Sequence, residues 1–491
     1  MIWTKNNHWM IPAIAFFAVT ACILASQATF RIGFPLDDAW IHQTYARNLA
    51  IYGEFAFIPG MPSAGSTSPL WTLLLVPGQW IGGAGVYIWT FLLGFACLTA
   101  LALVGDRLFR LMVTTTNIWL PAAGLLLVSE WHLVWAAVSG METTLYTAAI
   151  LLIFFLAWRG NSPGWVLGLL IGIAVWIRPD AITLLGPVAW MIFFEAVSKQ
   201  KRLLRLGWMF AAAIVPIAGF LMFNQALSGN PWPTTFYAKQ AEYAALLQSS
   251  IISRYLRIAT LPLVGVGILL LPGFIFQFWN IGKNRNWRLA ALLLWWLGYC
   301  GIYAFRLPVG YQHGRYLIPA MPIYFLLGLS GSVALFQTLS LTQLWKRRIR
   351  FASSVSVLMI SLVFLISGIR AYAGDVAVIE SEMVDTARWL QANTEADALL
   401  AVHDIGAVGY LSKRKIVDLA GLISPEVIPF MRDEARLADY LDSKRVDYLV
   451  TFPDWYRELH SGKEVAHQTD SEFSLAQGGT NMTVYRWETR K

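Results

Sequence analysis

Residues 69–82, PLWTLLLVPGQWIG, form an apolar stretch of 14 residues with proline at positions 69 and 77. A helix that crosses the hydrocarbon core of a bilayer, about 30 Å thick, needs about 20 apolar residues. The stretch is short for a span, and it is typical of a re-entrant or interfacial helix. Whether it crosses determines on which side of the membrane every later loop lies.

The whole chain has the composition of an integral membrane protein. Of its 491 residues, 57% are hydrophobic and 13% are charged, and the mean hydropathy is +0.54, which is too apolar for a soluble protein. The net charge of +8 comes from short basic clusters between apolar segments, which argues against nucleic-acid binding. The three cysteines all lie in apolar segments, so they indicate neither a disulfide framework nor a metal cluster.

Eleven other apolar segments are predicted to cross the membrane. If residues 69–82 do not cross, the basic clusters at 199–205, 283–288 and 346–350 all face the cytosol, as the positive-inside rule requires. We therefore predict an α-helical polytopic protein with about 11 transmembrane helices and a re-entrant or interfacial helix in its first external loop, residues 30–83. The spans are predicted near residues 9–28, 84–105, 117–131, 142–158, 164–178, 180–197, 206–226, 258–281, 288–305, 316–337 and 351–370.

The C-terminal part lacks such segments and carries 13 Lys and Arg against 20 Asp and Glu. Residues 382–393 have helical periodicity, and shorter runs at 396–402, 446–450 and 481–487 have the pattern of strands. We predict a transmembrane domain, residues 1–370, and a small α/β domain, residues 371–491. The span count places this domain on the extracytoplasmic side, together with the first external loop.

The first external loop contains two adjacent aspartates, Asp37 and Asp38. Adjacent carboxylates repel each other, so both ionise only if a cation, a metal ion or hydrogen-bond donors lie nearby, and otherwise one pKa rises. Either outcome makes a useful base or cation ligand. The structural alternative is that Asp38 caps the helix predicted at residues 39–50 while Asp37 is solvated. Capping explains one aspartate and not two.

Acidic residues and an arginine lie at the external ends of other spans. Glu142 is either a charge at a helix N-terminus or faces a cavity. Arg178 and Asp180 lie between two spans. An arginine at such a place needs a partner, and we expect a structural ion pair between the two.

Cationic residues lie in two further external loops. Lys239 follows Tyr237 in a long loop, where a lysine on its own is usually solvated. His313 and Arg315 lie at the mouth of a span, where two donors can hold a phosphate. Carboxylates and cations on one face indicate a reaction in which a hydroxyl is deprotonated while an anionic group leaves.

The donor in such a reaction is expected to be a membrane lipid. Nucleotide sugars and ATP are not available outside the cytoplasmic membrane, and the chain has neither a G-x-x-x-x-G-K-[ST] loop nor a G-x-G-x-x-G motif. A sugar linked to a polyprenyl phosphate meets the requirement, because its tail can lie between helices while its head reaches the interface.

Seven stretches follow one another along nearly the whole chain: LDDAWIHQTYARNLA (36–50), FIPGMPSAGSTSPLWTLLL (57–75), SGMETTLY (139–146), WIRPDA (176–181), PTTFYAK (233–239), HGRYLIPAMP (313–322) and HDIGAVGYLSKRKIVDLAGLISPEV (403–427). Together they resemble the GT-C superfamily of polyprenyl-phosphate-sugar-dependent glycosyltransferases. The closest resemblance is to the cell-wall arabinofuranosyltransferase branch and related bacterial membrane glycosyltransferases.

The resemblance implies a role for each site residue. The acidic pair of the superfamily falls on Asp37 and Asp38, with Asp37 preferred as the general base that helps an acceptor hydroxyl attack the anomeric carbon with inversion. No cofactor is required, and a divalent cation beside Asp38 stays open. The residues expected to bind the donor phosphate are Lys239, Arg315, His313 and Tyr237. The residues expected to bind substrate are His42, Tyr45, Glu142, Arg178 and Asp180.

The implied protein is a multi-pass enzyme of the bacterial cytoplasmic (inner) membrane, with its catalytic face and C-terminus extracytoplasmic. Its partners would be a polyprenyl-phosphate sugar donor, a glycan or lipid acceptor and membrane lipids, and no nucleic acid. Residues 68–71 read SPLW, where protein O-mannosyltransferases have His-Pro-Pro-Leu, which makes a protein acceptor less favoured. Two alternatives stay open: a transporter or flippase of a lipid-linked sugar, and an oligosaccharide ligase that uses a diphosphate lipid.

The densest polar motif of the C-terminal domain contains His403 and Asp404. The domain is expected to bind the acceptor glycan, although a histidine such as His403 is more often structural than catalytic. Aromatic side chains can stack on sugar rings or fill a small core, and we expect core positions for Trp389, Trp455 and Tyr456.

Overall fold

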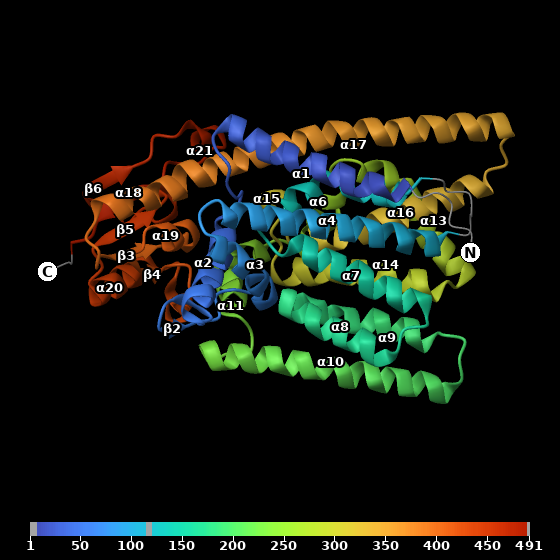
Figure 1. Ribbon diagram of the computed structural model, residues 1–491, viewed down its shortest axis with the longest axis horizontal. Helices are drawn as coiled ribbons and strands as arrows, with labels where there is room; N and C mark the ends of the chain where they lie inside the picture. Colours follow the sequence, from blue (N-terminus) through green and yellow to red (C-terminus); the bar gives the residue numbers. More distant parts are fainter. Residues whose placement is uncertain (1–6, 114–119, 489–491) are drawn as a thin grey trace.

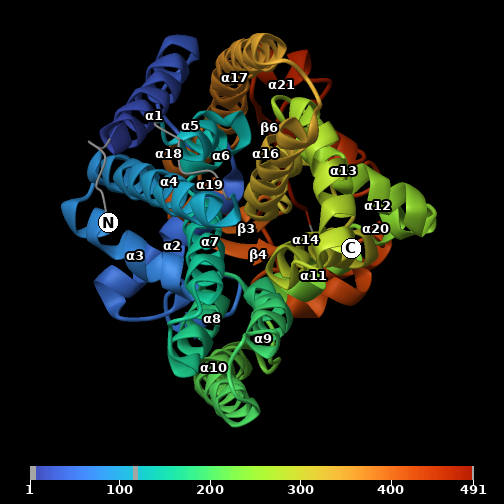
Figure 2. The same ribbon diagram turned by 90° about the vertical axis from the view of Figure 1, so that its right-hand side faces the viewer.

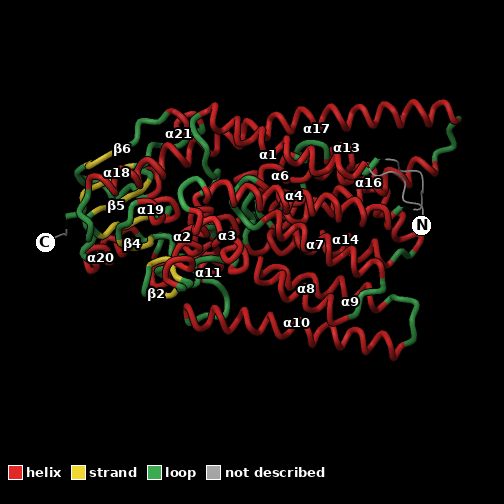
Figure 3. Tube along the Cα trace, viewed as in Figure 1, coloured by secondary structure: helices red, strands yellow, loops and turns green. Residues whose placement is uncertain are grey.

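The computed structural model describes residues 7–113 and 120–488. A bundle of long helices occupies most of its length, and a domain that contains strands lies at one end of the bundle (Figures 1 and 3). The main helices of the bundle are α1 (Met10–Thr29), α4 (Gly85–Met112), α7 (Thr143–Arg159), α8 (Gly164–Ile177), α9 (Leu185–Phe193), α10 (Lys199–Ser228), α13 (Gly267–Asn284), α14 (Trp287–Arg306), α16 (Met321–Thr338) and α17 (Gln343–Ile379).

The bundle is that of a multi-pass membrane protein by the length and composition of its helices. Of the residues described, 6 helices are long and apolar enough to cross a membrane, or 7 if one bent pair is a single span. Three shorter apolar helices, Thr143–Arg159, Gly164–Ile177 and Pro179–Phe193, accompany them. The count of about 11 spans therefore stays a prediction.

Two predicted spans have a different form in the structure. Residues 122–137, in place of the span expected at 117–131, form two short helices, α5 (Ala122–Ser129) and α6 (Trp131–Ala137); residues 117–119 lie outside the described part. The chain bends because the buried Glu130 accepts a 3.1 Å hydrogen bond from the backbone N–H of Leu133 and so caps α6.

The span expected at residues 258–281 is also broken. The segments Ile251–Leu263 and Gly267–Asn284 meet at an angle of 115°. Pro262 and the left-handed Gly265, with a φ of 114°, interrupt the helix there. The first segment contains α12 (Ile251–Ala259), which exposes Ile252 and Leu256.

Residues 30–83, predicted as the first external loop and called by that name below, fold into two helices and a small hairpin. α2 (Asp37–Tyr52) begins with the acidic pair, and β1 (Ala56–Ile58) pairs with β2 (Met61–Pro62). The apolar stretch at 69–82 is α3 (Pro69–Ile81), a helix of 13 residues that begins with Pro69 and packs against α2 and α4. Its Trp80 is 71% exposed. Its length is well short of a span.

The C-terminal domain is built on a sheet of five strands in the order β4-β3-β5-β7-β6. β3 is parallel to both β4 and β5, whereas β7 is antiparallel to β5 and β6. The elements are α18 (Asp385–Asn393), β3 (Leu399–Val402), α19 (Ile405–Leu411), β4 (Lys415–Asp418), α20 (Glu434–Lys444), β5 (Tyr448–Thr451), β6 (Val465–Gln468), α21 (Glu472–Ala476) and β7 (Thr483–Arg486).

One helix connects the two parts without a break. α17 continues through a π-helical turn, Glu380–Val384, into α18, so that helix extends from Gln343 to Asn393. The boundary expected between residues 370 and 371 lies inside it. One hydrophobic core likewise includes Trp40 of α2, Leu98 of α4 and Val408 of α19. Figure 2, which looks along the bundle, shows β3 and β4 behind the helix ends.

Candidate active site

Asp37 connects the first external loop to the C-terminal domain. Its Oδ2 accepts a 2.7 Å hydrogen bond from the backbone N–H of Gly406, and its Oδ1 accepts one of 2.8 Å from Ala407. Both donors lie in the first turn of α19, which packs against α2 (Figure 1). α2 begins at Asp37 with Leu36 as its N-cap residue, so Asp38 lies inside the first turn and the alternative in which Asp38 caps that helix is wrong.

Arg315 is the partner of the second aspartate. It is 8% exposed, and its Nη2 lies 2.6 Å from Asp38 Oδ2 and donates to the hydroxyl of Tyr316 at 3.0 Å. Among the described residues, its Nε and Nη1 have no hydrogen-bond partner. An unpaired buried N–H group carries a free-energy cost that a further anion would remove.

Lys239 lies on α11 (Thr234–Glu242) with an acidic partner on the same face of the helix. Its Nζ is 3.2 Å from Glu242 Oε2. Burial acts to lower the pKa of Lys239, but the charges of Asp38 and Glu242 outweigh it and raise that pKa. The lysine is therefore a second fixed positive charge near Asp38, and it is not simply solvated.

Asp37, Asp38, Lys239 and Arg315 line one cavity of about 460 Å³, which we call the polar cavity. The C-terminal domain contributes to the lining through residues that follow β3, β4 and β5. The complete lining is Leu36, Asp37, Asp38, Ile41, Lys239, Glu242, Tyr243, Tyr311, Gln312, Arg315, Val378, Ile379, Met383, His403, Asp404, Ile405, Ala420, Leu422, Phe452 and Trp455.

The carboxyl groups of the polar cavity differ in pKa. Burial raises the pKa of Asp37 to about 6, although two backbone N–H groups act against it. Burial acts on Asp38 in the same direction, but Arg315 and Lys239 outweigh it and hold the pKa of Asp38 below its usual value. Burial, together with the charge of Asp37, raises the pKa of Asp404 well above its usual value.

Several lining residues were not predicted as site residues. Glu242 could have been found, because it lies three residues after Lys239 and therefore on the same helical face. His403 donates to or accepts from the hydroxyl of Tyr456 at 2.7 Å, and its other ring nitrogen lies 3.8 Å from Glu242 Oε1. Trp455, expected in the core, is 43% exposed and lines the cavity.

The five residues predicted to bind substrate lie outside the lining of the polar cavity. His42, which is 3% exposed, contacts Ser66 Oγ at 3.0 Å and Glu142 Oε2 at 3.5 Å. Glu142 also accepts from Arg178 Nη1 at 3.1 Å. These side chains form a buried network next to the cavity, and their role in binding stays a prediction.

The remaining two members of that set are also held by protein groups. Arg178 Nε lies 3.2 Å from Asp180 Oδ1, which is the expected ion pair. The hydroxyl of Tyr45 is fully buried, lies 2.6 Å from Ser63 Oγ and accepts a hydrogen bond from the backbone N–H of Gly65.

His313 and Tyr237, predicted to bind the donor phosphate, do not line the polar cavity. His313 Nε2 lies 2.8 Å from Asp375 Oδ2 on α17. Gln312 and His313 have left-handed backbone angles, with φ of 51° and 58°, in the turn α15 (Tyr311–Gly314) directly before Arg315. Such angles cost energy in residues other than glycine, and the contact with Asp375 helps to hold the turn.

No group of three or more His, Cys, Asp or Glu side chains that could hold a metal ion occurs in the described part of the chain. Asp38 Oδ2 is already paired with Arg315. A divalent cation beside Asp38 stays a prediction.

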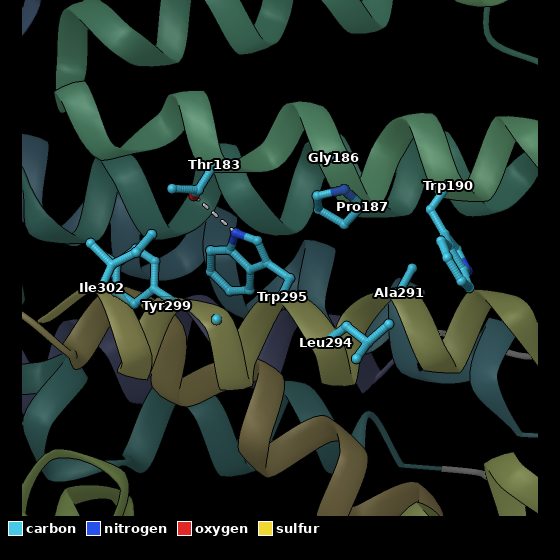
Figure 4. A pocket seen from close by; sticks show the side chains of 10 residues that line it. Thr183, Gly186, Pro187, Trp190, Ala291, Leu294, Trp295, Tyr299 and Ile302 are labelled. Carbon is cyan, nitrogen blue, oxygen red and sulfur yellow. Dashed lines mark hydrogen bonds between the residues drawn. The ribbon is translucent and has the colours of Figure 1, made fainter. Parts of the chain in front are cut away.

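A second cavity, of about 470 Å³, lies between α14 and the segment Pro179–Phe193 (Figure 4). Its lining is almost entirely apolar, and Trp295 Nε1 donates to Thr183 Oγ1 at 3.1 Å across it. Tyr299, which lines this cavity, donates to Asp180 Oδ2 at 2.5 Å. The apolar cavity thus ends at the polar residues next to the candidate site.

The C-terminal domain matches a family model. Residues 371–485 match a domain of unknown function, DUF8728. No curated protein matches the chain.

Solved structures match over nearly the whole chain. ArnT from Cupriavidus metallidurans bound to undecaprenyl phosphate has a TM-score of 0.62 at 12% identity, with 98% of each chain covered. The archaeal oligosaccharyltransferase AglB from Archaeoglobus fulgidus, in complex with an inhibitory peptide and a dolichol-phosphate, has a TM-score of 0.62 at 12% identity, with 92% of this chain and 70% of that chain covered.

Mycobacterial arabinofuranosyltransferase AftD also matches, at a TM-score of 0.46 and 15% identity, with 98% of this chain and 42% of that chain covered. Because this TM-score is low, the closer resemblance to the arabinofuranosyltransferase branch stays a prediction. ArnT and AglB, the two neighbours with a TM-score of 0.62, are GT-C glycosyltransferases. The chain therefore has the fold of the GT-C glycosyltransferases.

Proposed function

We propose that the protein is a membrane glycosyltransferase that moves a sugar from a polyprenyl-phosphate donor to a glycan or lipid acceptor of the cell envelope, on the extracytoplasmic side. The observation that carries this proposal is Arg315. It is fixed by Asp38 at 2.6 Å and still has two N–H groups without partners among the described residues. This arrangement suits a phosphate that bears part of its charge at the start of the reaction and more as it leaves.

Lys239 supplies the second cation for the leaving phosphate. It lines the same cavity as Arg315. Binding a phosphate would place its charge beside two cations that now balance Asp38 and Glu242. The charge that develops on the leaving oxygen is stabilised by groups already in position, so little reorganisation is needed in the transition state.

Asp37 is the preferred base. Its pKa of about 6 is closer to neutral than that of Asp38, and a base works best with a pKa near the working pH. Each carboxylate oxygen accepts one backbone N–H, which leaves further lone pairs for a hydroxyl proton. The acceptor oxygen bonds to the anomeric carbon, the bond from that carbon to the phosphate oxygen breaks with its electron pair, and the hydroxyl proton moves to Asp37, with inversion.

The likeness to ArnT and AglB supports the class of donor. The ArnT structure is bound to undecaprenyl phosphate and the AglB structure to a dolichol-phosphate, and both are lipid phosphates. Because AglB is an oligosaccharyltransferase, a ligase that transfers a whole oligosaccharide from a diphosphate lipid is the second candidate. The two differ in whether the donor has one phosphate or two.

The test is a donor panel. The purified full-length protein, in lipid nanodiscs, is incubated with radiolabelled polyprenyl-phosphate and polyprenyl-diphosphate sugars and with an envelope extract from cells that lack the protein. We expect label to move to the extract from a monophosphate donor. Transfer only from diphosphates would favour the ligase, and no transfer with donor translocation in sealed vesicles would favour a flippase.

The double variant Asp37→Asn/Asp38→Asn is expected to abolish transfer. Asp397→Asn is the matched control, because Asp397 is exposed in the C-terminal domain and outside the polar cavity. Equal activity of wild type and the double variant would remove the acidic pair from the chemistry.

A further inference from the structure

The sheet of the C-terminal domain presents one particular edge to the polar cavity. β3, β4 and β5 are parallel, so their carboxyl ends lie at the same edge. Cavity residues follow each of them: His403 and Asp404 come directly after β3, Leu422 lies four residues after the end of β4, and Trp455 lies four residues after the end of β5. The C-terminal domain therefore forms its wall of the cavity with the carboxyl edge of the sheet.

This edge contains a topological switch point. In the strand order β4-β3-β5-β7-β6, the chain leaves β3 for β4 on one side and leaves β5 for β6 and β7 on the other. Open α/β sheets bind ligands in the crevice beyond the carboxyl ends of two such strands. Here the crevice between the ends of β3 and β5 opens into the polar cavity, where His403, Asp404 and Trp455 lie.

The side chains at this crevice suit a sugar. Trp455 is 43% exposed, and the ring of His403 stands at 81° to it with the centroids 4.6 Å apart. His403 is itself held by the hydroxyl of Tyr456. A fixed, partly exposed indole offers an apolar surface to the C–H face of a pyranose or furanose, beside polar groups that fix orientation.

Asp404 supplies the polar contact. Its Oδ2 is buried and has no hydrogen-bond partner among the described residues. A buried carboxyl oxygen without a partner carries a free-energy cost, which the hydroxyl of a ligand would remove. In its protonated form the same group donates one hydrogen bond and accepts others, which matches a hydroxyl that both donates and accepts.

The charges of the cavity separate this crevice from the phosphate site. Arg315 and Lys239 lie on the wall formed by the transmembrane domain, whereas Asp404 and His403 lie on the wall formed by the C-terminal domain. Glu242, on α11 with Lys239, lies 3.2 Å from Lys239 Nζ and 3.8 Å from His403 Nε2, so it contacts both groups. Arg315 and Lys239 attract a phosphate, whereas Asp404 and Trp455 offer it no positive charge, so we expect an anionic group at the two cations and an uncharged sugar beside Asp404 and Trp455.

We infer that the end of β3 and β5 is a sugar-binding subsite, in which Trp455 stacks on the ring and Asp404 bonds its hydroxyls. This inference rests on the proposed function and assigns the binding of the sugar part of the substrate to the C-terminal domain. It gives the domain a direct part in choosing which sugar is used.

The experiment measures binding without transfer. Full-length protein in nanodiscs is mixed with a panel of methyl glycosides, and saturation-transfer NMR reports which of them bind. Binding of undecaprenyl phosphate to the same samples is measured separately by native mass spectrometry. We expect at least one glycoside to bind the wild-type protein, and Trp455→Ala and Asp404→Asn to lose at least five-fold of its signal while lipid binding is unchanged.

Two further variants make the result specific. Trp455→Phe keeps an aromatic face and is expected to retain part of the glycoside signal. Trp389→Ala is the control, because Trp389 stacks on His467 in the same domain and does not line the cavity. Thermal unfolding of every variant shows whether it is folded.

The outcomes separate the subsite from the proposed function. If Trp455→Ala and Trp389→Ala bind glycosides equally, or if no glycoside binds the wild type, the subsite is wrong even where the donor panel shows transfer. If glycoside binding depends on Trp455 and no donor supports transfer, the subsite stands and the glycosyltransferase proposal fails.

Discussion

Asp37 accepts a 2.7 Å hydrogen bond from the backbone N–H of Gly406, 369 residues further along the chain. One end of this contact is the acidic pair of the first external loop, and the other is the first turn after β3. The contact makes the geometry of the preferred base depend on the position of the C-terminal domain, so a change in either part is expected to change the other.

Substitution of Gly406 tests this dependence. A methyl group at residue 406 would clash with the backbone oxygen and the carboxylate of Asp37. We expect Gly406→Ala to lower the Tm and to abolish transfer. Gly374→Ala is the matched control: a Cβ there comes no closer than 3.7 Å to Gln477, and alanine inside a helix adds about 0.5–1 kcal/mol of stability. Similar melting curves for both variants would contradict the predicted clash.

The rate of transfer should depend on pH through Asp37. Only the ionised carboxylate can take the hydroxyl proton, and burial raises its pKa to about 6. We therefore expect kcat to fall as the pH is lowered through about 6 and to be constant above it. Asp37→Asn should lower kcat about 10²- to 10⁴-fold and remove that limb from the profile. A limb with its midpoint near the usual pKa of an aspartate would point to another group.

Arg315 and Asp38 should behave as a pair. Arg315→Gln removes the cation paired with Asp38, and we expect a lower Tm as well as loss of undecaprenyl phosphate binding. The double variant Asp38→Asn/Arg315→Gln removes both charges, so it should regain most of the Tm without regaining lipid phosphate binding. If the double variant binds the lipid phosphate as the wild type does, Arg315 is a structural residue only.

Lys239 should contribute to donor binding alone. Lys239→Gln removes one cation from the phosphate site, and we expect the KM for the donor to rise about tenfold, equivalent to about 1.4 kcal/mol, with the KM for the acceptor unchanged. Lys415→Gln, an exposed lysine at the start of β4, serves as the control. Equal effects of the two variants on the donor KM would exclude a specific contact.

Thiol labelling tests the predicted topology. The native cysteines are all buried, which keeps the background low. We expect a membrane-impermeant maleimide to label Gln248→Cys in intact cells and to label Lys201→Cys only after the membrane is opened, since 199–205 is predicted to be cytosolic. The reverse pattern would show that residues 69–82 cross the membrane.

The acidic pair and the two cations could be placed together from sequence because a membrane limits where charged groups can lie. Asp37 and Asp38 follow one span, Lys239 lies between two others, and Arg315 precedes a fourth. Once the positive-inside rule assigns those loops to one side, the charges share a thin layer at the surface. That layer is small enough for the four side chains to meet around one cavity.

The wall formed by the C-terminal domain could not be placed in this way. Asp404 and Trp455 reach the cavity only because the sheet docks with its carboxyl edge toward α2, and docking depends on packing that has no local pattern. Tyr456, next to Trp455 in sequence, is 2% exposed as expected for a core residue. The bend at Glu130 was missed for a related reason, since a buried carboxylate that caps a helix inside an apolar segment is visible only in three dimensions.

The uninterrupted helix from Gln343 to Asn393 has a mechanical consequence. Its first half, residues 343–367, lies mostly exposed on the outside of the bundle, whereas Ile379 and Met383 near its other end are buried and line the polar cavity. A rigid rod of this kind changes its tilt when the surrounding bilayer becomes thinner or thicker. We expect a change of tilt at the exposed end to displace the buried end sideways, so that the thickness of the lipid around the protein affects the width of the polar cavity.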